Sequence, residues 1–390
     1  MTFSLQQQEL IKKEFAHLST DYFNTAYFGP SPYRAKQKVS NALFKELDPS
    51  FFPYHAWIGI PDRIRSKIAS LLKITSDHIA LGSSTSDFIS MVANHLPHFS
   101  DSNSTVVCGL KGDYPSCILP WMVAAKYRRN LQFHAIKPPE DYQQNLTVDW
   151  LDEHLPKDTQ VFCVSYVQFD TGRSFDLKQI AAYLKSRNIF FILDATQALA
   201  GISLTHEELK NIDVLCCSLY KWFLGPYGSA FAYFSQRALD VIPHNTGNWI
   251  VSTNSRDVTR LTAYTTETLM GARKFDRGQG PNMLTNAALE ASLELLEELG
   301  LENIALYNQE LQKYFLSQFN QQKYELVTPI HPRCPSTIIS IKAKTANPSD
   351  IESELKHRNI DVSVREGKIR ISIHFFNTKK QVDVLLDALL

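Results

Sequence analysis

An acid and a lysine each stand directly after an apolar run of the sequence. Asp194 ends the run IFFILD, and Lys221 follows VLCCSLY. Ligands of open α/β sheets bind at the carboxyl ends of the strands, so we expect both side chains at that edge. A buried carboxylate needs a cationic partner, and a lysine in a partly apolar pocket can lose its proton and attack a carbonyl carbon. Pyridoxal phosphate (PLP) offers a ring nitrogen to the acid and an aldehyde to the lysine.

Two further segments could hold the phosphate and the ring of such a cofactor. The segment GSSTS at 82–86 follows HIALG, so Ser84 and Thr85 would stand at a helix N-terminus, where anions bind. Tyr114 follows the run TVVCGL and presents an aromatic face that could stack on a pyridine ring. Each of these residues could instead have an ordinary structural role. Asp194, Ser84 and Thr85 could cap helices, Lys221 could be a surface residue at a strand end, and Tyr114 could be a loop aromatic.

The elements that would position these residues alternate along the chain. From about residue 78, short apolar and β-branched runs alternate with amphipathic stretches, which predicts an α/β fold with a mostly parallel sheet flanked by helices. In SFDLKQIAAYLKSRN, the residues Leu177, Ile180, Ala181 and Leu184 form one apolar helical stripe. The predicted strands are HIALG, TVVCGL, QVFCVS, IFFILD, IDVLCCS and GSAFAYF.

A smaller α+β lobe is predicted at the C-terminal end. It begins with NAALEASLELLEELG, a long helix that ends at Gly300, and continues with the strands STIISIKA, IDVSV and KIRISI. Capping boxes would start two helices there, at Ser349-x-x-Glu352 and Thr378-x-x-Gln381. The N-terminal stretch MTFSLQQQELIKKEF has the pattern of an amphipathic helix. We expect a large PLP-binding domain over 20–283 and a small domain over 1–19 and 284–390, packed together because no long linker separates them.

Composition and missing motifs exclude several classes of protein. Forty basic residues balance forty acidic residues over 390 positions, so no net charge draws the chain onto nucleic acid or an anionic membrane. No run approaches the ~20 apolar residues of a membrane span, and no apolar signal core follows the N-terminus. Six cysteines without a CxxC pair are expected to be buried free thiols in a cytoplasmic protein. The signatures GxGxxG, GxxxxGKS/T, HExxH and GxSxG are absent, and we predict no metal site.

Eight segments occur in an order that resembles the class V aminotransferase family of fold type I PLP-dependent enzymes. They are YFNTAYFGPSP (22–32), GSSTSD (82–87), DYPSCILPW (113–121), VQFDTG (167–172), DATQALAG (194–201), SLYKWFLGPYGSA (218–230), ARKFDRG (272–278) and IRISIHFFNT (369–378). That family includes cysteine desulfurases, kynureninase and isopenicillin N epimerase-like proteins. The resemblance covers nearly the whole chain, and it implies a fold type I architecture with PLP as the cofactor.

The resemblance implies a role for each matching residue. Lys221 would form the internal aldimine with PLP and then move the proton at Cα, and Asp194 would pair with the ring nitrogen. Gln197 would hydrogen-bond the ring hydroxyl, and Tyr114 would stack on the ring. The phosphate would be held by Ser84, Thr85, Ser218 and Tyr220.

Three further matches concern the substrate and a second subunit. Arg370 would grip the α-carboxylate of the substrate, and Asn24 lies in the family's N-terminal pocket segment. The glycine loop at Gly278 would reach the phosphate of the neighbouring subunit, which implies a homodimer with shared active sites. Gln279 stands where the family often has threonine, so this cross-subunit contact remains open.

Departures from the family pattern narrow the reaction. Desulfurases carry a nucleophilic cysteine on a loop before the carboxylate-binding arginine, whereas residues 335–370 contain none and Cys334 abuts the strand STIISIKA. We therefore predict an aminotransferase that acts at Cα of a small L-amino acid, because transamination needs only the lysine to move the proton. The alternative is β-elimination by a PLP-dependent carbon–sulfur lyase of the cysteine or cysteine-sulfoxide type, with His55, His244 and Tyr27 as candidate acids. A catalytically silent binding module on the same fold is the third interpretation.

Overall fold

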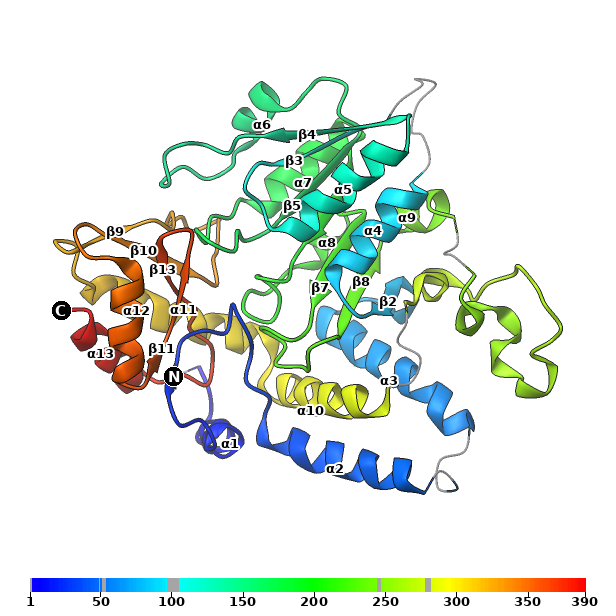
Figure 1. The fold of residues 1–390 in the computed structure, drawn as a ribbon, viewed down its shortest axis with the longest axis horizontal. Helices are drawn as coiled ribbons and strands as arrows, with labels where there is room; N and C mark the ends of the chain where they lie inside the picture. Colours follow the sequence, from blue (N-terminus) through cyan, green and yellow to red (C-terminus); the bar gives the residue numbers. More distant parts are fainter. Residues whose placement is uncertain (1, 49, 51–53, 97–104, 244–246, 278–281) are drawn as a thin grey trace.

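A seven-stranded sheet forms the centre of the larger lobe (Figure 1). The computed structural model describes residues 2–48, 50, 54–96, 105–243, 247–277 and 282–390. Across the sheet lie β2 (Ile79–Gly82), β8 (Ala230–Phe234), β7 (Val214–Ser218), β6 (Phe190–Asp194), β5 (Val161–Ser165), β3 (Thr105–Leu110) and β4 (Leu131–Ile136). The pairings from β4 to β7 are parallel, whereas β8 runs antiparallel to both β7 and β2. The predicted mostly parallel sheet is confirmed, although β4 was not predicted.

Alternate residues of the central strands enter two different cores. Phe190 and Ile192 of β6 pack into the core formed with α4 (Thr85–His95) and α5 (Pro115–Tyr127). Phe191 and Leu193 pack on the opposite face of the sheet, where the apolar stripe of α7 (Leu177–Ser186) is buried as predicted. Because both faces are covered, the strands contain nearly continuous apolar runs. The large lobe also contains α2 (Tyr33–Leu47), α3 (Tyr54–Leu72), α6 (Val148–His154), α8 (His206–Leu209) and α9 (Gln236–Val241).

A four-stranded antiparallel sheet forms the centre of the smaller lobe. Its order is β12 (Ser363–Arg365), β13 (Lys368–Ile371), β10 (Ile339–Ala343) and β9 (Tyr324–Leu326). Beside it, β1 (Asp21–Tyr22) pairs in parallel with β11 (Ile360–Asp361). The core under this sheet is completed by side chains of α11 (Leu301–Gln318), α12 (Pro348–His357) and α13 (Lys379–Ala388).

The two predicted capping boxes of the small lobe have different outcomes. The box at Thr378 is confirmed, because the side chains of Thr378 and Gln381 cap each other's backbone at the start of α13. The start predicted at Ser349 is wrong, because α12 begins at Pro348 and its N-cap is Asn347. The Asn347 side-chain oxygen accepts a hydrogen bond from the Ser349 backbone at 3.0 Å. Proline at the first helical position fits this earlier start.

Helix α10 (Met283–Leu299) leads from the large lobe into α11 of the small lobe (Figure 1). The predicted stripe of Leu289, Leu293 and Leu296 is buried, and the helix ends at Gly300, where φ is +79°. That conformation favours glycine, which explains the stop. The predicted domain boundary between residues 283 and 284 falls in the first turn of this helix and stays a prediction.

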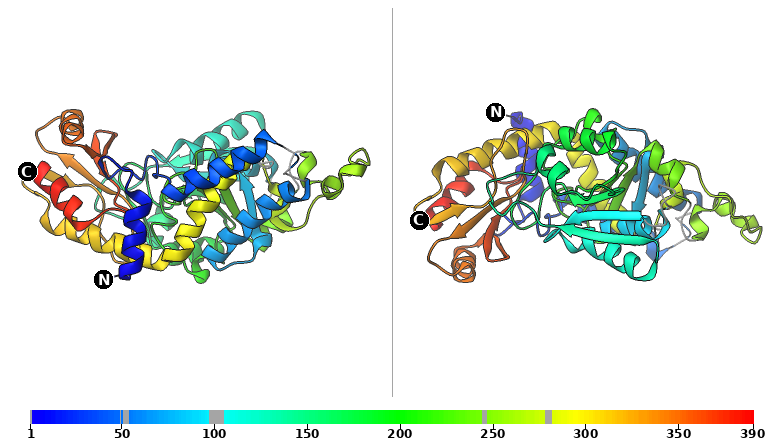
Figure 2. Two further views of the ribbon diagram at one scale, coloured as in Figure 1. Left: turned by 90° about the horizontal axis from the view of Figure 1, so that it is seen from below. Right: turned by 90° about the horizontal axis from the view of Figure 1, so that it is seen from above.

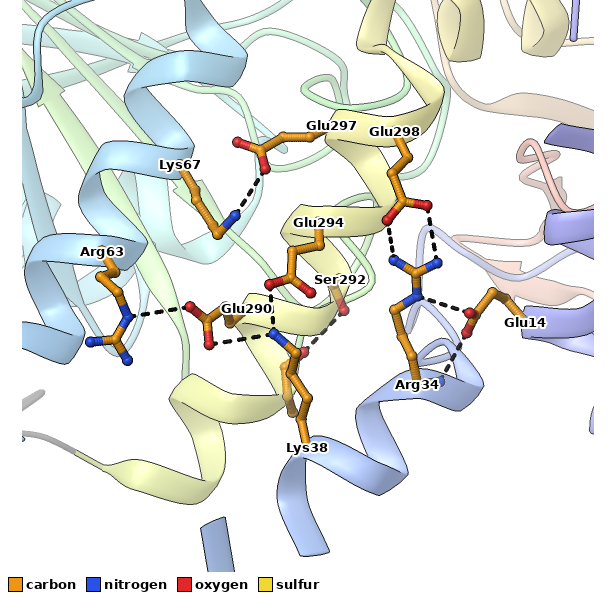
Figure 3. A network of polar contacts seen from close by, with 11 residues as sticks. Glu14, Arg34, Lys38, Arg63, Lys67, Glu290, Ser292, Glu294, Glu297 and Glu298 are labelled. Atoms are coloured by element: carbon orange, nitrogen blue, oxygen red, sulfur yellow. Dashed lines mark hydrogen bonds and ion pairs between the residues drawn. The ribbon is translucent and has the colours of Figure 1, made fainter. Parts of the chain in front are cut away.

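Glutamate side chains of α10 form a row of ion pairs with basic residues of α2 and α3 (Figure 3). Lys38 on α2 contacts Glu294 at 2.6 Å, and Lys67 on α3 contacts Glu297 at 2.9 Å. Arg34 donates to Glu298 of α10 at 2.6 Å and to Glu14 at 2.8 Å. Glu14 belongs to α1 (Leu5–Phe15), which confirms the predicted N-terminal helix. Arg34 therefore connects α1 to α2 and α10.

The small lobe and the segment 247–270 lie at opposite ends of the large lobe (Figure 2). This segment contains the short 3₁₀ helices η3 (Trp249–Val251), η4 (Thr253–Arg256) and η5 (Val258–Arg260), and it is followed by η6 (Gly271–Phe275). Another 3₁₀ helix, η2 (Ser76–His78), precedes β2.

All six cysteines are buried free thiols, as predicted. Within the described part of the chain, no helix is long and apolar enough to cross a membrane.

Candidate active site

One cavity lies at the carboxyl ends of the parallel strands. Its walls come from the loops after β2, β3, β5, β6 and β7, which is the edge that the sequence indicated. The structure brings eight of the predicted site residues to this cavity: Ser84, Thr85, Tyr114, Asp194, Gln197, Ser218, Tyr220 and Lys221. Asn24 and Arg370, the other two described ones, are not part of its lining, although Arg370 contacts the lining residue Phe169. Gly278 lies outside the described residues, as do Gln279, His244 and the side chain of His55.

Lys221 is buried, with only 6% of its surface exposed. Burial and, to a smaller extent, the charge of Arg370 lower its pKa from 10.5 to about 8, while the charge of Asp194 opposes both effects. At neutral pH this change raises the fraction of neutral amine about 300-fold. Lys221 is therefore prepared to act as a nucleophile or a base without a second residue to deprotonate it.

Asp194 lines the same cavity, and its charge acts on this lysine. Burial raises the pKa of Asp194, and hydrogen bonds from Thr196 and the charge of Lys221 oppose that rise. Its Oδ1 accepts from the Thr196 backbone at 2.9 Å, and its Oδ2 lies 3.9 Å from the thiol of Cys117. The Thr196 hydroxyl in turn accepts from the Ser218 backbone at 3.0 Å, which ties the end of β6 to the end of β7.

Two aromatic rings stand close to the lysine. The Lys221 amine lies 5.3 Å from the ring centre of Tyr114 and 5.5 Å from that of Tyr220. Tyr114 caps the N-terminus of α5 directly before Pro115, and its ring meets Phe169 edge to face at 5.4 Å. A planar group bound next to the Lys221 amine would therefore contact the ring of Tyr114.

Asp113 was not predicted, and it fixes the loop that carries Tyr114. Its Oδ1 accepts from the Tyr114 backbone at 2.6 Å, and its Oδ2 accepts from the Ser165 backbone at 2.8 Å. Burial raises the pKa of Asp113 to about 6. Its position between a buried strand and Tyr114 is the signal that could have found it, because a carboxylate there can satisfy the backbone donors of the turn.

The opposite end of the cavity is lined by hydroxyl groups at a helix N-terminus. Ser84 is the N-cap of α4, and its oxygen accepts from the Asp87 backbone at 3.1 Å. The Thr85 backbone donates to the Ser218 hydroxyl at 3.4 Å. The predicted helix start is confirmed, and its backbone donors and hydroxyls suit an anion such as a phosphate.

Gln197 binds the N-terminal segment to the site, and Asn24 connects that segment to the small lobe. The Gln197 side chain donates to the Ala26 carbonyl at 3.0 Å and accepts from the Trp222 indole at 3.0 Å. The second N–H of the Gln197 amide is then available for the predicted hydrogen bond to the ring hydroxyl of PLP. Asn24 donates to Asp361 at 2.9 Å, and its own side-chain oxygen is buried without a hydrogen-bond partner in the part of the chain that the structure describes.

Arg370 reaches the site from strand β13 of the small lobe. It is 2% exposed, and it donates to the Ser363 hydroxyl at 3.2 Å and to the Phe169 carbonyl at 2.9 Å. Its Nη2 is buried and has no hydrogen-bond partner among the described residues. Burial and the charge of Arg365 lower the pKa of Arg370 to about 9. A buried guanidinium with a free donor is suited to bind a carboxylate.

The large mixed sheet, its flanking helices and the small antiparallel sheet define the fold type I class of PLP-dependent enzymes. Two solved structures share it: C-DES with glycine covalently linked to its PLP cofactor (18% identity, TM-score 0.86, 97% of this chain and 98% of that chain), and the cysteine desulfurase of Thermococcus onnurineus (18% identity, TM-score 0.81, 98% and 96%). Residues 58–385 match the model of the aminotransferase class-V family. The chain belongs to this family.

Known relatives of the chain carry several different names. The uncharacterized aminotransferase YcbU of Bacillus subtilis is 24% identical over 90% of both chains. A probable cysteine desulfurase of Pyrococcus abyssi is 23% identical, over 83% of this chain and 81% of its own. The kynureninase of Deinococcus radiodurans is 24% identical, over 70% of this chain and 64% of its own. Family membership therefore defines the class of enzyme but leaves the reaction open.

Proposed function

We propose that the protein is a PLP-dependent aminotransferase that acts at Cα of a small L-amino acid. The observation that carries the proposal is Lys221, a buried amine whose pKa is lowered to about 8 and which lines one cavity with Asp194 and Tyr114. Membership of a PLP-dependent family and a cavity with an anion-binding end support the same conclusion.

The residues of the cavity fit PLP group by group. The N-terminus of α4 and the hydroxyls of Ser84, Thr85 and Ser218 would bind the phosphate, and Asp194 would hold a proton on the ring nitrogen. When bound, PLP supplies an electron-accepting ring that stabilises negative charge at Cα. Lys221 would remove the proton from Cα and return it, because its neutral amine is accessible at physiological pH.

Transamination fits this cavity because it requires one proton carrier. The described lining contains Lys221 but neither histidine nor cysteine. Cys334, the thiol nearest in sequence to a desulfurase nucleophile, is buried and lines a separate groove with His331 and Pro332. Burial raises the pKa of Cys334 to about 11, so its thiol is protonated at neutral pH and unsuited to nucleophilic attack.

Carbon–sulfur β-elimination is the second candidate. Tyr114, Tyr220 and Tyr227 line the cavity, and a tyrosine hydroxyl could protonate a departing thiolate. C-DES, which shares the fold, is described as a cystine C–S lyase whose product is cysteine persulfide. Both reactions begin with proton removal from Cα, so only the products distinguish them.

The first test is the visible spectrum of the purified protein with PLP, followed by borohydride reduction and peptide mapping. We expect the reduced cofactor on Lys221 and loss of the visible band in Lys221→Ala, whereas Lys73→Ala, at a lysine 75% exposed, should retain the band. An unchanged band in Lys221→Ala would refute the assignment.

A single-turnover panel of amino acids then separates the reactions. Transamination transfers the amino group to the cofactor and releases a 2-oxo acid without ammonia. Elimination releases ammonia and pyruvate without an amino acceptor, and bound PLP with no product from any amino acid would support the silent binding module.

The proposal includes a homodimer with shared sites. The loop at Gly278, which lies outside the described residues, is the segment expected to reach the neighbouring subunit's phosphate. Sedimentation of the purified protein measures the subunit number, and a Gly278→Tyr variant should weaken PLP binding only if that loop contacts the site. A monomer that binds PLP and turns over would contradict this part of the proposal.

A further inference from the structure

Three cationic side chains share one face of the small sheet. In the antiparallel pair of β12 and β13, Arg365 lies opposite Lys368, and Ser363 lies opposite Arg370. Opposite residues and alternate residues along a strand point to the same face, so Arg365, Lys368 and Arg370 form one cationic face. The residue between the two cations of β13, Ile369, packs into the core on the other side.

The cationic face is turned toward the loop after β5, which lines the candidate active site. Arg370 donates to the carbonyl of Phe169, and Phe169 is part of the cavity lining. Lys368 forms an ion pair of 3.0 Å with the neighbouring residue, Asp170. The small lobe therefore presents its charged side to the cavity at the boundary with the large lobe.

Only one of the three cations has an acidic partner in the described part of the chain. Asp170 neutralises Lys368, whereas neither Arg365 nor Arg370 forms an ion pair with a described residue. Arg370 retains a buried donor, Nη2, to which no described residue offers an acceptor. Asp170 also attracts Arg370, but a carboxylate bound directly to the buried guanidinium of Arg370, and a second one at the half-buried guanidinium of Arg365, would add charge-assisted hydrogen bonds.

Arg365 stands at the outer edge of this face. Its guanidinium donates to the Val364 carbonyl at 2.8 Å and lies 5.8 Å from the ring centre of Tyr27, which is 58% exposed. Diagonal neighbours on an antiparallel pair, such as Arg365 and Arg370, have Cβ atoms about 7 Å apart. Their side chains can therefore bind the two ends of one short molecule.

The electrostatics of the site agree with this placement. The charges of Arg365 and Arg370 both lower the pKa of Lys221, and the charge of Arg365 also lowers the pKa of Arg370. Arg365 thus acts on the same small region as the lysine and the buried arginine.

We propose that the substrate carries two carboxylates, as an amino dicarboxylate or a 2-oxo dicarboxylate does, with the α-carboxylate on Arg370 and the second one on Arg365. The proposal rests on the proposed function for the amine chemistry, but recognition of the dianion requires no turnover. Arg365 is then the residue that determines specificity, because a monocarboxylate would leave its guanidinium unpaired.

The test compares succinate with butyrate, which has the same number of carbon atoms and one carboxylate. Binding to the PLP-loaded protein is measured by calorimetry. We expect succinate to bind about 10- to 100-fold more tightly, the range of a hydrogen bond to a charged group. Arg365→Gln should abolish this preference and leave butyrate binding nearly unchanged. Arg358→Gln, at a 53% exposed arginine paired with Glu354 in the same lobe, should retain the preference.

Two results would overturn the inference. One is equal affinity for the two probes in the unchanged protein, which requires no variant and hence no assumption about folding. The other is an equal loss of both affinities in Arg365→Gln, which would show that Arg365 only supports the α-carboxylate site. A dicarboxylate preference without any turnover would leave the inference standing and refute the proposed reaction, so the two failures are distinguishable.

Kinetics provide a second readout when turnover is observed. L-aspartate with L-asparagine, and L-glutamate with L-glutamine, differ by one charge at nearly constant shape. In whichever of the two pairs reacts faster, we expect kcat/KM for the acid to exceed kcat/KM for the amide by about 10-fold or more. In Arg365→Gln the acid and the amide should have nearly equal kcat/KM values. A preference for the amide would contradict the inference.

Discussion

Replacing Lys221 with methionine in cofactor-free protein measures the free energy required to keep an ammonium group in the site. The side chain is 6% exposed, and burial is the main reason that its pKa falls from 10.5 to about 8. Below pH 8 both the folded and the unfolded chain carry the proton, and the buried charge costs the folded state about 3 kcal/mol. Lys221→Met should therefore raise the free energy of unfolding by about that amount at neutral pH.

The pH dependence of this gain has a definite sign. Between pH 8 and 10.5 the unfolded chain retains the lysine proton while the folded chain has lost it, so the stability of the unchanged protein rises with pH. The gain from Lys221→Met should shrink over this interval and vanish above it. The attraction of Asp194 for the ammonium is already included in the lowered pKa.

Urea unfolding of the two cofactor-free proteins at several pH values from 7 to above 10.5 is the appropriate assay. Lys73→Met is the matched control, because Lys73 is 75% exposed and its pair with Glu302 is solvent-screened. The control should change stability little and equally at every pH. A gain below about 1 kcal/mol for Lys221→Met at neutral pH, or a gain that does not shrink with pH, would refute the assignment of Lys221 as a destabilised, reactive amine.

Three further predictions follow from other parts of the structure. Arg370→Ala should raise KM for carboxylate substrates about 30-fold or more, because a charged pair is lost; an unchanged KM in steady-state kinetics would mean that another residue binds the carboxylate. Burial lowers the pKa of His374 to about 3, so the unfolded chain alone gains a proton as pH falls below 6.5 and stability declines. His374→Gln should flatten that decline in thermal unfolding, and equal slopes would contradict the reasoning. Arg34→Ala should lower stability by about 1 kcal/mol, and less in high salt, because it breaks the contacts with Glu14 and Glu298 (Figure 3); no change in urea unfolding would show that these pairs contribute nothing.

Strands with both faces buried were predictable, and the exposed edge strand was not. β6 reads FFILD because alternate residues enter two separate cores. β4 reads LQFHAI, and Gln132 and His134 are exposed, since the strand lies at the end of the sheet. An edge strand needs few apolar residues on its open side, so its sequence lacks the apolar run that marks the others.

The location of the cavity was also predictable, because the polar residues that line it directly follow apolar runs that form parallel strands. Asp194 and Lys221 were found in this way. Asp113 and Thr196 were missed because they act on backbone groups of neighbouring strands, and those neighbours are known only from the register of the sheet. The free donor of Arg370 likewise depends on packing between lobes, which no local pattern encodes.

The two lobes are electrostatically coupled, because the charge of Arg370 in the small lobe acts on Lys221 in the large lobe. The large lobe supplies Lys221, and the small lobe supplies Arg370, whose positive charge lowers the pKa of that lysine. A carboxylate bound to Arg370 offsets this charge, and the lysine then holds a proton more strongly. Substrate binding would therefore make Lys221 a stronger base at the moment when a Cα proton is present to be removed. In the empty site the lowered pKa leaves a minor fraction of the amine neutral and nucleophilic at neutral pH, and in the occupied site the neutral amine is a stronger base, so a single lysine can serve both steps of the proposed reaction.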